Sequence, residues 1–386
     1  MIVWLPAVPW IAVFVMVVYR YASRAPALRD YAPRTSGPLL SVVIPARNEA
    51  VNIAECIRSI REARYAPLEI VVVDDRSSDA TLERAVAAAR EPGPAPVTVI
   101  RGVDPPPGWY GKPWALVQGY QAAAGGLLLF ADADTRHSPE LIPRAVQALE
   151  TERADLVTVL PRQEMGSFWE RLLQPHVFLA LATRVSDLRR VNRTRRVWDA
   201  IANGQFILTT RAAYEAAGTH AAVHDSVVDD LLIAQTYVRC GRDIFLVHAT
   251  EYMRTRMYRS LGEIVEGWSK NLALGTPLMM PPVAPLRRIV PWLMWTPALA
   301  WLAPPVAWAV WGVPWAAVAT LASLLLFVEV NRREGAPLWY ALLYPVGAAI
   351  VAFIMLRSAW RGGRRVEWKG RVYGEGSRAA PPAWRS

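Results

Sequence analysis

Cysteine is scarce in this sequence: its 386 residues include only Cys56 and Cys240. Two cysteines exclude a disulfide framework and a cysteine-rich zinc module. No Gly-X-Y period runs through the 31 prolines, which excludes collagen. Charged residues are also few, at 20% against 53% hydrophobic residues, and this balance excludes a disordered chain.

Two nucleotide-binding patterns are absent as well. The sequence contains neither Gly-x-Gly-x-x-Gly, which binds dinucleotides, nor Gly-x-x-x-x-Gly-Lys-Ser/Thr, which wraps phosphates in P-loop proteins. These absences disfavour a hydride-transfer enzyme and a P-loop ATPase. The chain does have 17 tryptophans and a mean hydropathy of +0.17, and both indicate that part of it lies in lipid. Its length predicts two parts.

Uncharged apolar residues are concentrated in two regions. In the first, residues 2–19 carry no charge and are long enough to cross a bilayer once, which predicts a membrane helix over residues 1–20. A signal peptide is the alternative, but no charged region precedes the stretch and no small-x-small cleavage pattern follows it. Four arginines come soon after this stretch: Arg20, Arg24, Arg29 and Arg34. Because Lys and Arg gather on the cytoplasmic side of a membrane, we expect an outward N-terminus and a cytoplasmic domain. The formal net charge of +10 also suits an anionic leaflet.

The second apolar region covers residues 286–358 and is predicted to hold two or three membrane helices. Glu329 is the single charge within its two long apolar stretches, residues 289–330 and 338–356. Three crossings would leave the basic tail, residues 359–386, outside, against the preference of Lys and Arg for the cytoplasmic side. The alternative is that the beginning of the first stretch lies in the membrane interface or re-enters.

Between the membrane regions, residues 38–275 alternate between strand-like and helical patterns. Apolar, β-branched runs predict strands at residues 39–44, 68–73, 97–100, 127–130 and 156–160. Helical patterns follow them at residues 51–63, from a cap at 77–79 to about residue 90, and at 112–124 and 139–149. Near-continuous apolar strands that alternate with helices predict a parallel sheet covered on both faces, with ligands outside the carboxyl ends of the strands.

Acidic residues follow two of these predicted strands. Asp74 and Asp75 come after the second run, and Asp132 and Asp134 come after the fourth. Carboxylates gathered at one edge repel one another, and a divalent cation such as Mg²⁺, held with substrate phosphates, offsets the repulsion. Each pair by itself is also consistent with a solvated turn. Two pairs at equivalent positions of one alternating domain favour a metal–diphosphate site.

Longer motifs in this region resemble family 2 glycosyltransferases, which have the GT-A fold. In chain order they are SVVIPARNEAVNIAECIRSI, EIVVVDDRSSDATLERA, GWYGKPWALVQGYQAA, LLLFADADT, NGQFILTTRAAYEAAG and HDSVVDDLLIAQTYVRCG. The resemblance implies an α/β nucleotide-diphospho-sugar transferase domain with a mixed, mostly parallel sheet and helices on both faces. The segments RMY…EGWSKN and WKGR-Y are similar to those of membrane-anchored, hopanoid-associated and diaponeurosporenoate (carotenoid) glycosyltransferases.

By this resemblance, one set of residues binds the nucleotide-sugar donor. The set lies at predicted strand ends and at a helix start: Pro45, Ala46, Asn48, Glu49, Asp74, Asp75, Lys112 and Asp132. Lys112 would reach the nucleotide or its diphosphate, although a lone lysine is more often a surface residue. The resemblance also makes Asp132 and Asp134 the ligands of Mg²⁺ or Mn²⁺, with Asp134 in direct contact with the metal.

Glycosyl transfer to a hydroxyl needs a base that removes the hydroxyl proton. The motif match assigns Asp230 as this base and Asp229 as its partner, and an acidic helix start is the structural alternative. Three histidines could complete a metal shell, although oxygen ligands suit Mg²⁺ and Mn²⁺ better: His220, His224 and His248. The residues expected to contact the acceptor are Gly204, Gln205, Trp268 and Lys270.

The sequence therefore predicts an inverting glycosyltransferase that moves one sugar from a UDP-sugar to a membrane lipid or isoprenoid acceptor, of carotenoid or hopanoid type. We expect a multi-pass protein of the cell membrane with a cytoplasmic catalytic domain, and no nucleic-acid partner. Processive relatives carry Gln-x-x-Arg-Trp where this chain has Glu-Gly-Trp-Ser-Lys-Asn at residues 266–271, which favours addition of a single sugar. The alternatives are a processive polysaccharide synthase and a nucleotide-binding membrane protein without catalysis.

Overall fold

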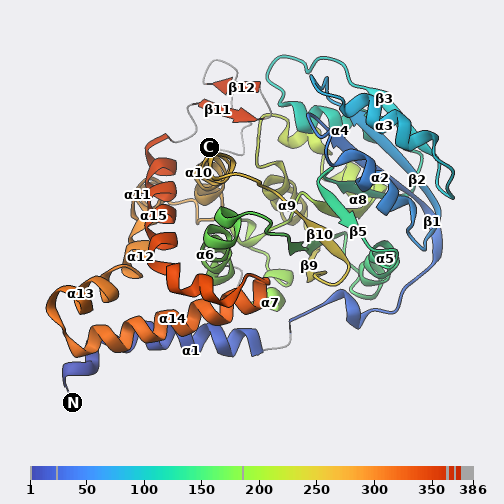
Figure 1. Ribbon diagram of the computed structural model, residues 1–386. Coiled ribbons are helices and arrows are strands. Elements are labelled where there is room, and N and C mark those ends of the chain that lie inside the picture. The colour runs from blue at the N-terminus through green and yellow to red at the C-terminus, as the bar shows by residue number, and fades with distance from the viewer. Residues whose placement is uncertain (1, 23–24, 185–186, 362–364, 369–370, 375–386) are drawn as a thin grey trace. The chain divides into compact units, whose positions relative to one another are not determined.

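The computed structural model describes residues 2–22, 25–184, 187–361, 365–368 and 371–374, and it divides into two compact units. The sheet unit consists of Ala25–Arg162, Leu188–Met257 and Gly363–Ser386. The helical unit consists of Met1–Arg24, Gln163–Asp187 and Tyr258–Gly362. Figure 1 shows the elements of both units in colours that follow the chain.

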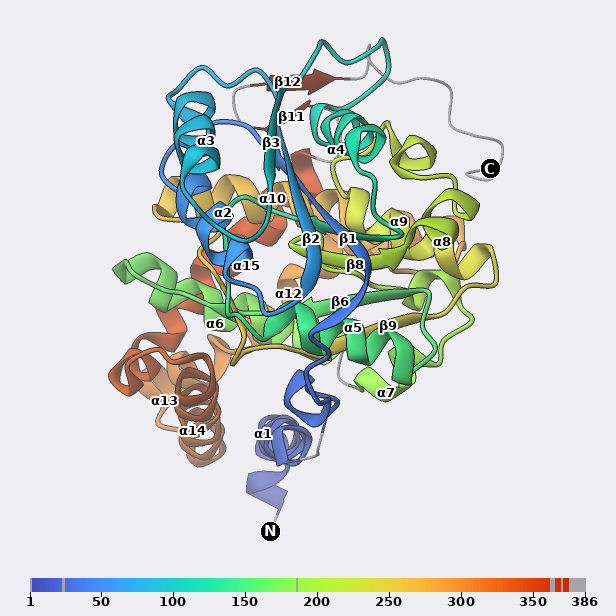
Figure 2. The ribbon, with the colours of Figure 1, turned by 90° about the vertical axis from the view of Figure 1, so that its right-hand side faces the viewer.

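The sheet unit is built on a seven-stranded sheet with the order β3-β2-β1-β4-β8-β6-β9, part of which faces the viewer in Figure 2. Its strands are β1 (Ser36–Ala46), β2 (Ala66–Asp74), β3 (Val97–Arg101), β4 (Leu127–Ala131), β6 (Leu156–Leu160), β8 (Phe206–Thr210) and β9 (Ile244–His248). The first four are parallel, β8 is antiparallel to β4 and to β6, and β9 is parallel to β6.

The five apolar runs of the sequence predict β1, β2, β3, β4 and β6 correctly, and they miss β8 and β9. The expectation of a purely parallel sheet is wrong, because β8 inserts between β4 and β6 in the opposite direction. The sheet is mixed and mostly parallel, as the family resemblance implies. The reversal matters for the site, because it brings the beginning of β8 beside the end of β4.

Helices flank the sheet, and the first four of them lie where the helical patterns predict them, with ends that differ by a few residues. They are α2 (Ile53–Arg61), α3 (Thr81–Arg90), α4 (Gly111–Ala122), α5 (Leu141–Thr151), α7 (Leu188–Asn192), α8 (Arg211–Ala216) and α9 (Asp229–Arg239). The short elements are the 3₁₀ helices η2 (Leu28–Asp30), η3 (Val197–Asp199) and η4 (His220–Val223), and the strands β5 (Thr135–His137), β7 (Arg162–Gln163), β10 (Met253–Thr255), β11 (Arg365–Trp368) and β12 (Arg371–Gly374).

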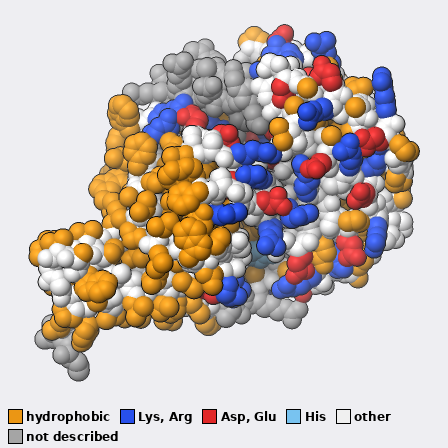
Figure 3. Space-filling model, viewed as in Figure 1, with side chains coloured by type: hydrophobic (Ala, Val, Ile, Leu, Met, Phe, Trp, Pro, Cys, Tyr) orange, Lys and Arg blue, Asp and Glu red, His pale blue; other side chains and the backbone are white. Residues whose placement is uncertain are grey.

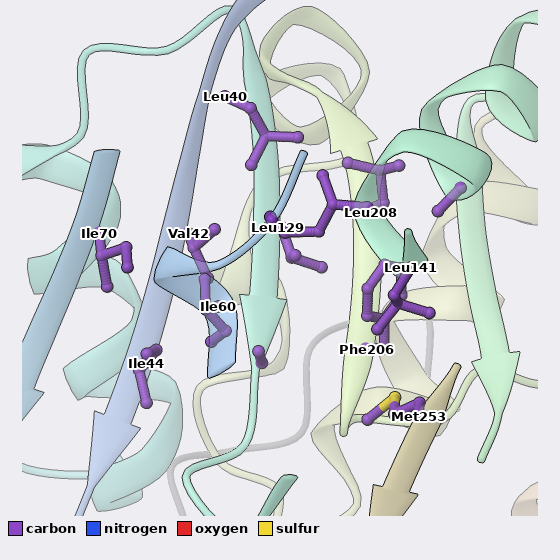
Figure 4. Packing of buried hydrophobic residues seen from close by; sticks show 14 of the residues in the cluster. Leu40, Val42, Ile44, Ile60, Ile70, Leu129, Leu141, Phe206, Leu208 and Met253 are labelled. Carbon is purple, nitrogen blue, oxygen red and sulfur yellow. The ribbon is translucent and has the colours of Figure 1, made fainter. Parts of the chain in front are cut away.

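One face of the sheet packs against α2 and α5. Val42 and Ile44 of β1 lie in one buried cluster with Ile60 of α2 and Leu141 of α5 (Figure 4). Leu129 of β4 belongs to the same cluster, and every residue of β4 is buried. Burial on both faces explains why these strands are continuous apolar runs rather than alternating ones.

The other face packs against α4, and a glycine makes the close approach possible. A Cβ atom added to Gly119 of α4 would lie 2.4 Å from Cγ1 of Val43 and 3.1 Å from Cγ2 of Val73. Carbon atoms without a bond between them cannot approach to 2.4 Å, so a residue with a side chain would push α4 off the sheet. Since α4 also carries Lys112 in its first turn, this packing sets where that lysine lies.

We expect Gly119→Ala to lower the melting temperature of the full-length protein in detergent. The added methyl group overpacks the contact of α4 with the sheet, a change that costs about 1–3 kcal/mol. Gly262→Ala is the matched control, because a Cβ atom at this helical glycine would meet nothing within 4 Å and alanine favours the helix. Equal melting temperatures for the two variants would contradict the tight packing of α4.

The helical unit consists almost entirely of helices. They are η1 (Ile2–Ala7), α1 (Val8–Ala22), α6 (Phe168–Arg184), α10 (Leu261–Leu278), α11 (Ala284–Leu293), α12 (Trp295–Ala300), α13 (Ala303–Trp311), α14 (Pro314–Glu334), η5 (Leu338–Leu343) and α15 (Tyr344–Arg361). Many large apolar side chains are exposed on this unit, among them Trp308, Trp311 and Trp360, and Figure 3 shows hydrophobic side chains gathered over it.

Two helical segments among the described residues are long and apolar enough to cross a membrane, Pro314–Glu334 and Leu338–Arg361. The helix pair Ala284–Ala300 and Ala303–Trp311 is bent by 46° at the break between its two parts. It makes a third candidate if the two parts form one span. The N-terminal apolar helix Val3–Tyr19 is shorter. Most of the basic tail expected at residues 359–386 lies outside the described residues.

Candidate active site

Three loops of the sheet unit begin at one edge of the sheet. Ala46, which follows Pro45 at the end of β1, pairs with Asp74 at the end of β2. β4 lies on the other side of β1 and runs in the same direction, with Phe130 opposite Val43. Because these strands are parallel, the segments after β1, β2 and β4 leave the sheet at the same edge. The two acidic pairs of the sequence follow β2 and β4 at this edge.

Hydrogen bonds hold the loops after β1 and β2 together. Asn48 has a φ of 53°, and its Oδ1 accepts a hydrogen bond from the N–H of Ser78 at 2.9 Å. The N–H of Glu49 donates to Oγ1 of Thr81 at 2.7 Å. Oε2 of Glu49 accepts from Nδ2 of Asn52 at 2.8 Å. Asn48 and Glu49 therefore shape this loop, whatever contact they also make with a ligand.

Asp74 and Asp75 are deeply buried, each with 2% of its surface exposed. Oδ2 of Asp74 accepts a long hydrogen bond from the N–H of Ser77 at 3.3 Å, while its Oδ1 is buried and accepts none from the described residues. The N–H of Asp75 donates to the carbonyl oxygen of Ala46 at 2.7 Å. A buried acceptor without a donor is unfavourable, so Oδ1 of Asp74 is suited to a ligand N–H or O–H.

The turn after β4 carries Asp132 and Asp134 on either side of the buried Ala133. Oγ1 of Thr135 donates to the carbonyl oxygen of Asp132 at 2.7 Å, and the thiol of Cys56 lies 3.6 Å from the same oxygen. Burial raises the pKa of Cys56 to about 12, so Cys56 is a protonated core residue. These contacts fix the backbone from which the two aspartates extend.

Lys112 connects the turn after β4 with the beginning of α9. Its Nζ lies 2.8 Å from Oδ1 of Asp132 and 4.0 Å from Oδ2 of Asp229. Burial by itself would lower the pKa of Lys112, but the carboxylates of Asp132, Asp229 and Asp230 raise it above its usual range. The lysine is therefore charged, and it acts as the shared counter-ion of three carboxylates.

Asp229 and Asp230 form the first turn of α9. Oδ2 of Asp230 accepts a hydrogen bond from the N–H of Gly204 at 3.1 Å, and its Oδ1 accepts from the N–H of Leu231 at 2.7 Å. Burial raises the pKa of both carboxyl groups, and the charge of Lys112 opposes this effect only in part. Acidic residues that merely complement a helix start are mostly exposed, whereas Asp229 is 3% exposed.

The antiparallel direction of β8 explains how Gly204 reaches this cluster. Phe206, the first residue of β8, pairs with Ala131, the last residue of β4. Gly204 precedes β8 by two residues, so it lies beside the turn after β4. A Cβ atom added to Gly204 would lie 3.1 Å from Cβ of Asp230 and 3.2 Å from Nζ of Lys112. The small residue thus permits the close approach of Asp230 and Lys112, while its contact with an acceptor stays a prediction.

His220 and Tyr214 lie next to the acidic pair. Nε2 of His220 is 4.0 Å from Oδ2 of Asp229, and its Nδ1 is 2.7 Å from the hydroxyl of Tyr214, which accepts from the N–H of His220 at 3.0 Å. The hydroxyl can then donate its own proton to Nδ1, which leaves an Nε2–H facing Asp229. Burial lowers the pKa of His220 to about 3, so the ring is neutral.

The residues present fit a divalent cation that shares its ligands with a substrate. Among the described residues no group of three or more His, Cys, Asp or Glu side chains is arranged to hold a metal ion, so His220, His224 and His248 complete no metal shell. Mg²⁺, however, usually takes only one or two carboxylates together with substrate phosphates, and Asp132 and Asp134 offer these. Lys112 gives one positive charge to three carboxylates, and a further cation would reduce the remaining repulsion.

The other three residues predicted to contact the acceptor are Gln205, Trp268 and Lys270. Gln205 is 6% exposed, and its Nε2 donates to Oγ1 of Thr255 at 2.9 Å, so its amide is engaged inside the fold. Trp268 and Lys270 belong to α10 of the helical unit, where the Trp268 ring packs at 5.9 Å from that of Phe178. Their contact with an acceptor stays a prediction.

Contacts of 4.0 Å or less thus link five of the predicted residues: Lys112, Asp132, Gly204, Asp229 and Asp230. Sequence reasoning misses Tyr214 and considers His220 only as a metal ligand. Nothing in the sequence connects these two residues with Asp229, because the packing of α8, η4 and α9 brings them together.

Comparisons with known proteins agree with this description. The family model described as "Glycosyl transferase family 2" matches residues 41–216. A 4,4'-diaponeurosporenoate glycosyltransferase of Staphylococcus aureus (strain MRSA252) is 26% identical over 347 residues, which cover 86% of this chain and 88% of that protein. The solved mannosyltransferase PcManGT from Pyrobaculum calidifontis, in complex with GDP-Man and Mn²⁺, is 21% identical with a TM-score of 0.56, and the match covers 91% of this chain and 99% of that chain.

The structural likeness confirms the GT-A fold that the motifs imply. The family match, residues 41–216, contains Lys112, Asp132 and Gly204, and Asp229 and Asp230 follow shortly after it. The motif resemblance drawn from the sequence is therefore confirmed over residues 41–216, and the roles of the individual site residues stay predictions.

We expect Gly204→Ala to reduce catalytic turnover by about tenfold or more without loss of the fold. The new methyl group displaces Asp230 or Lys112 by a few tenths of an ångström, and catalysis is sensitive to such misplacement. Gly126→Ala is the matched control, because its Cβ atom would meet only Cβ of Pro38 at 3.9 Å. Unchanged turnover of Gly204→Ala, with the melting temperature of the control, would exclude a strict geometric requirement at Asp230.

Proposed function

We propose that this chain is a family 2 glycosyltransferase that moves one sugar from a UDP-sugar to a lipid or isoprenoid acceptor and inverts the anomeric configuration. The observation that carries the proposal is the contact of Lys112 with Asp132 and Asp229 at one edge of the sheet. This edge combines a cation for a diphosphate with carboxylates for an attacking hydroxyl, and glycosyl transfer needs both.

Asp230 is proposed as the base. As the acceptor oxygen bonds to the anomeric carbon, its proton passes to the carboxylate of Asp230, and the bond from that carbon to the UDP oxygen breaks. The raised pKa of Asp230 improves proton transfer, because a base is most effective when its pKa is near the working pH. Asp229 is its proposed partner. A single displacement of this kind, opposite to the leaving UDP, inverts the anomeric carbon.

Lys112 is proposed to stabilise the departing diphosphate. Its ammonium group is buried among carboxylates and remains charged, so its position is fixed before negative charge develops on UDP. Asp134 and Asp132 are proposed to hold Mg²⁺ or Mn²⁺, which when bound supplies a Lewis acid to the same diphosphate. The Mn²⁺ and GDP-Man in the solved mannosyltransferase support this assignment.

The loops after β1 and β2 are proposed to bind the nucleoside. The buried Oδ1 of Asp74, which accepts no hydrogen bond from the described residues, would accept one from the uracil N–H or a ribose hydroxyl. Asp75 and the backbone of Pro45 and Ala46 would line the same pocket, with Asn48 and Glu49 shaping the loop. The choice of UDP follows the motif resemblance, and the experiment below tests it against GDP.

A lipid acceptor accounts for the helical unit. A transferase that glycosylates a membrane lipid must work at the bilayer, and the helical unit has segments that are long and apolar enough to hold it there. The name of the Staphylococcus aureus relative, a diaponeurosporenoate glycosyltransferase, supports an isoprenoid acceptor of carotenoid type. The acceptor proposed for this chain carries a hydroxyl group, because the carboxylate in that name would need no base. We therefore propose a multi-pass protein of the cell membrane with the sheet unit in the cytoplasm.

The proposal is tested with the full-length protein in detergent, Mn²⁺, a membrane lipid extract and parallel reactions with UDP-sugars and GDP-mannose. We expect UDP release together with lipids that gain the mass of one sugar. A ladder of masses would instead support a polysaccharide synthase. Nucleotide-sugar binding without sugar transfer to any extracted lipid would refute the proposed function.

Asp230→Asn should lower the rate of sugar transfer about 10²–10⁴-fold, because asparagine cannot accept the hydroxyl proton. Donor affinity should remain, since the loops after β1 and β2 are intact. The matched control is Asp243→Asn, which removes an exposed carboxylate paired with Arg195 at 2.7 Å, and it should keep full activity. If both variants transferred sugar equally well, Asp230 would not be the base.

The activity should also depend on pH in a defined direction. Burial places the pKa of Asp230 above the ordinary aspartate value of about 3.9. Activity should therefore be lost, as the pH falls, at a higher pH than an exposed aspartate would give. In Lys112→Met the loss of activity on the acidic side of the pH profile should move to still higher pH, because a positive charge that stabilises the ionised carboxylates is lost. If activity fell at the same pH in both proteins, Lys112 would not be the shared counter-ion of the carboxylates.

A further inference from the structure

Residues 338–361, which comprise η5 and α15, form a 24-residue segment that is apolar enough to cross a membrane, with a mean hydropathy of 2.0 over its most apolar 18 residues. Length and composition do not decide whether they do so. A segment that enters one leaflet and returns to the same side can be equally long and apolar. The deciding question is on which side of the membrane each end of the segment lies.

The beginning of this segment lies on the side of the sheet unit. It follows α14, which runs beside α1 in the same direction (Figure 1). The rings of Trp10 and Trp315 are 6.1 Å apart near the two helix starts, and Val17 and Val330 lie in one buried cluster near the two ends. α1 ends at Ala22, three residues before the sheet unit begins, so the adjacent end of α14 must be on that side too.

The end of the segment lies on the same side. α15 packs on α10, and Glu266 of α10 forms ion pairs with Arg357, at 2.9 Å, and with Arg361 at the end of α15. α10 begins at Leu261, only four residues after Met257, the last residue of a sheet-unit segment. Glu266 is in the second turn of α10, about 8 Å along its axis. In addition, the hairpin β11–β12 that follows α15 belongs to the sheet unit.

We propose that residues 338–361 do not cross the membrane: η5 enters the leaflet nearest the sheet unit, and α15 returns to the side it came from. The acyl chains of this leaflet are the partner of one apolar stripe along the segment. After the exposed Leu338 and Trp339 at its beginning, five large exposed side chains recur at spacings of three, four or seven residues: Leu342, Val346, Phe353, Leu356 and Trp360. Residues between them, such as Val351 and Ile354, are buried in a cluster of the helical unit.

The distribution of charge agrees with this topology. The crossings are then the shorter N-terminal apolar helix (Val3–Tyr19), the bent pair α11–α13 and α14. The link between α13 and α14 on the far side, residues 312–313, carries no charged side chain. The near side receives the basic flanks of these helices: Arg20, Arg24, Arg287, Arg288, Arg332, Arg333 and the basic tail. Three crossings that end with α14 thus remove the conflict between the tail and the positive-inside preference.

The test is labelling with a membrane-impermeant maleimide in sealed vesicles of both orientations. Cys240 is exposed on the sheet unit and serves as the reference for its side, while Cys56 is buried. In a Cys240→Ser background, we expect Ser377→Cys and Ser386→Cys to react from the side of Cys240. Trp311→Cys, at the exposed link between α13 and α14, should react only from the opposite side.

Phe353→Cys tests the lipid contact of the stripe itself. We expect Phe353→Cys to remain unlabelled in sealed vesicles of either orientation, because acyl chains cover this position in the membrane. After detergent is added, it should be labelled. Labelling of Ser377→Cys and Ser386→Cys from the side of Trp311→Cys would overturn the proposal. So would labelling of Trp311→Cys from the side of Cys240, or of Phe353→Cys in intact vesicles.

Discussion

The site depends on one electrostatic constraint: the buried ammonium group of Lys112 faces the three carboxylates of Asp132, Asp229 and Asp230. Burial raises the pKa of the carboxyl groups of Asp229 and Asp230, and the single charge of Lys112 opposes this effect only in part. One positive charge does not balance three carboxylates, so the cluster attracts a further cation. The same imbalance would suit a base near neutral pH and a metal that arrives with a diphosphate. Two glycines, Gly119 and Gly204, allow α4 and α9 to approach closely enough to maintain it.

The fold explains why these groups meet although they are far apart in the chain. Parallel strands place the ends of β1, β2 and β4 at one edge, where the loops after β1 and β2 are joined by hydrogen bonds. The single reversed strand, β8, then brings Gly204 to the same edge and to Asp230. A sheet with β8 parallel would begin that strand at the far edge, and the cluster would lack its contact with α9.

Some elements of the fold and the site could be predicted from the sequence and others could not, for physical reasons. The strands covered on both faces are continuous apolar runs, so β1 to β4 and β6 are visible in the pattern, and the acidic pairs after β2 and β4 follow from them. β8 and β9 fall between polar segments and are missed. Cys56 was predictable as core from its apolar helix, whereas Tyr214 and His220 became neighbours of Asp229 only through the packing of α8 and η4.

By itself the sequence determined which chemical groups are available, the order of the motifs and which segments are apolar enough for lipid, because composition and local periodicity carry that information. It could not determine which carboxylate Lys112 contacts, since that depends on where α4 is seated on the sheet. Nor could it determine the path of α15. Hydrophobicity is a property of a segment, but the side on which a helix ends depends on its neighbours, and here α1, α10 and α14 decide it.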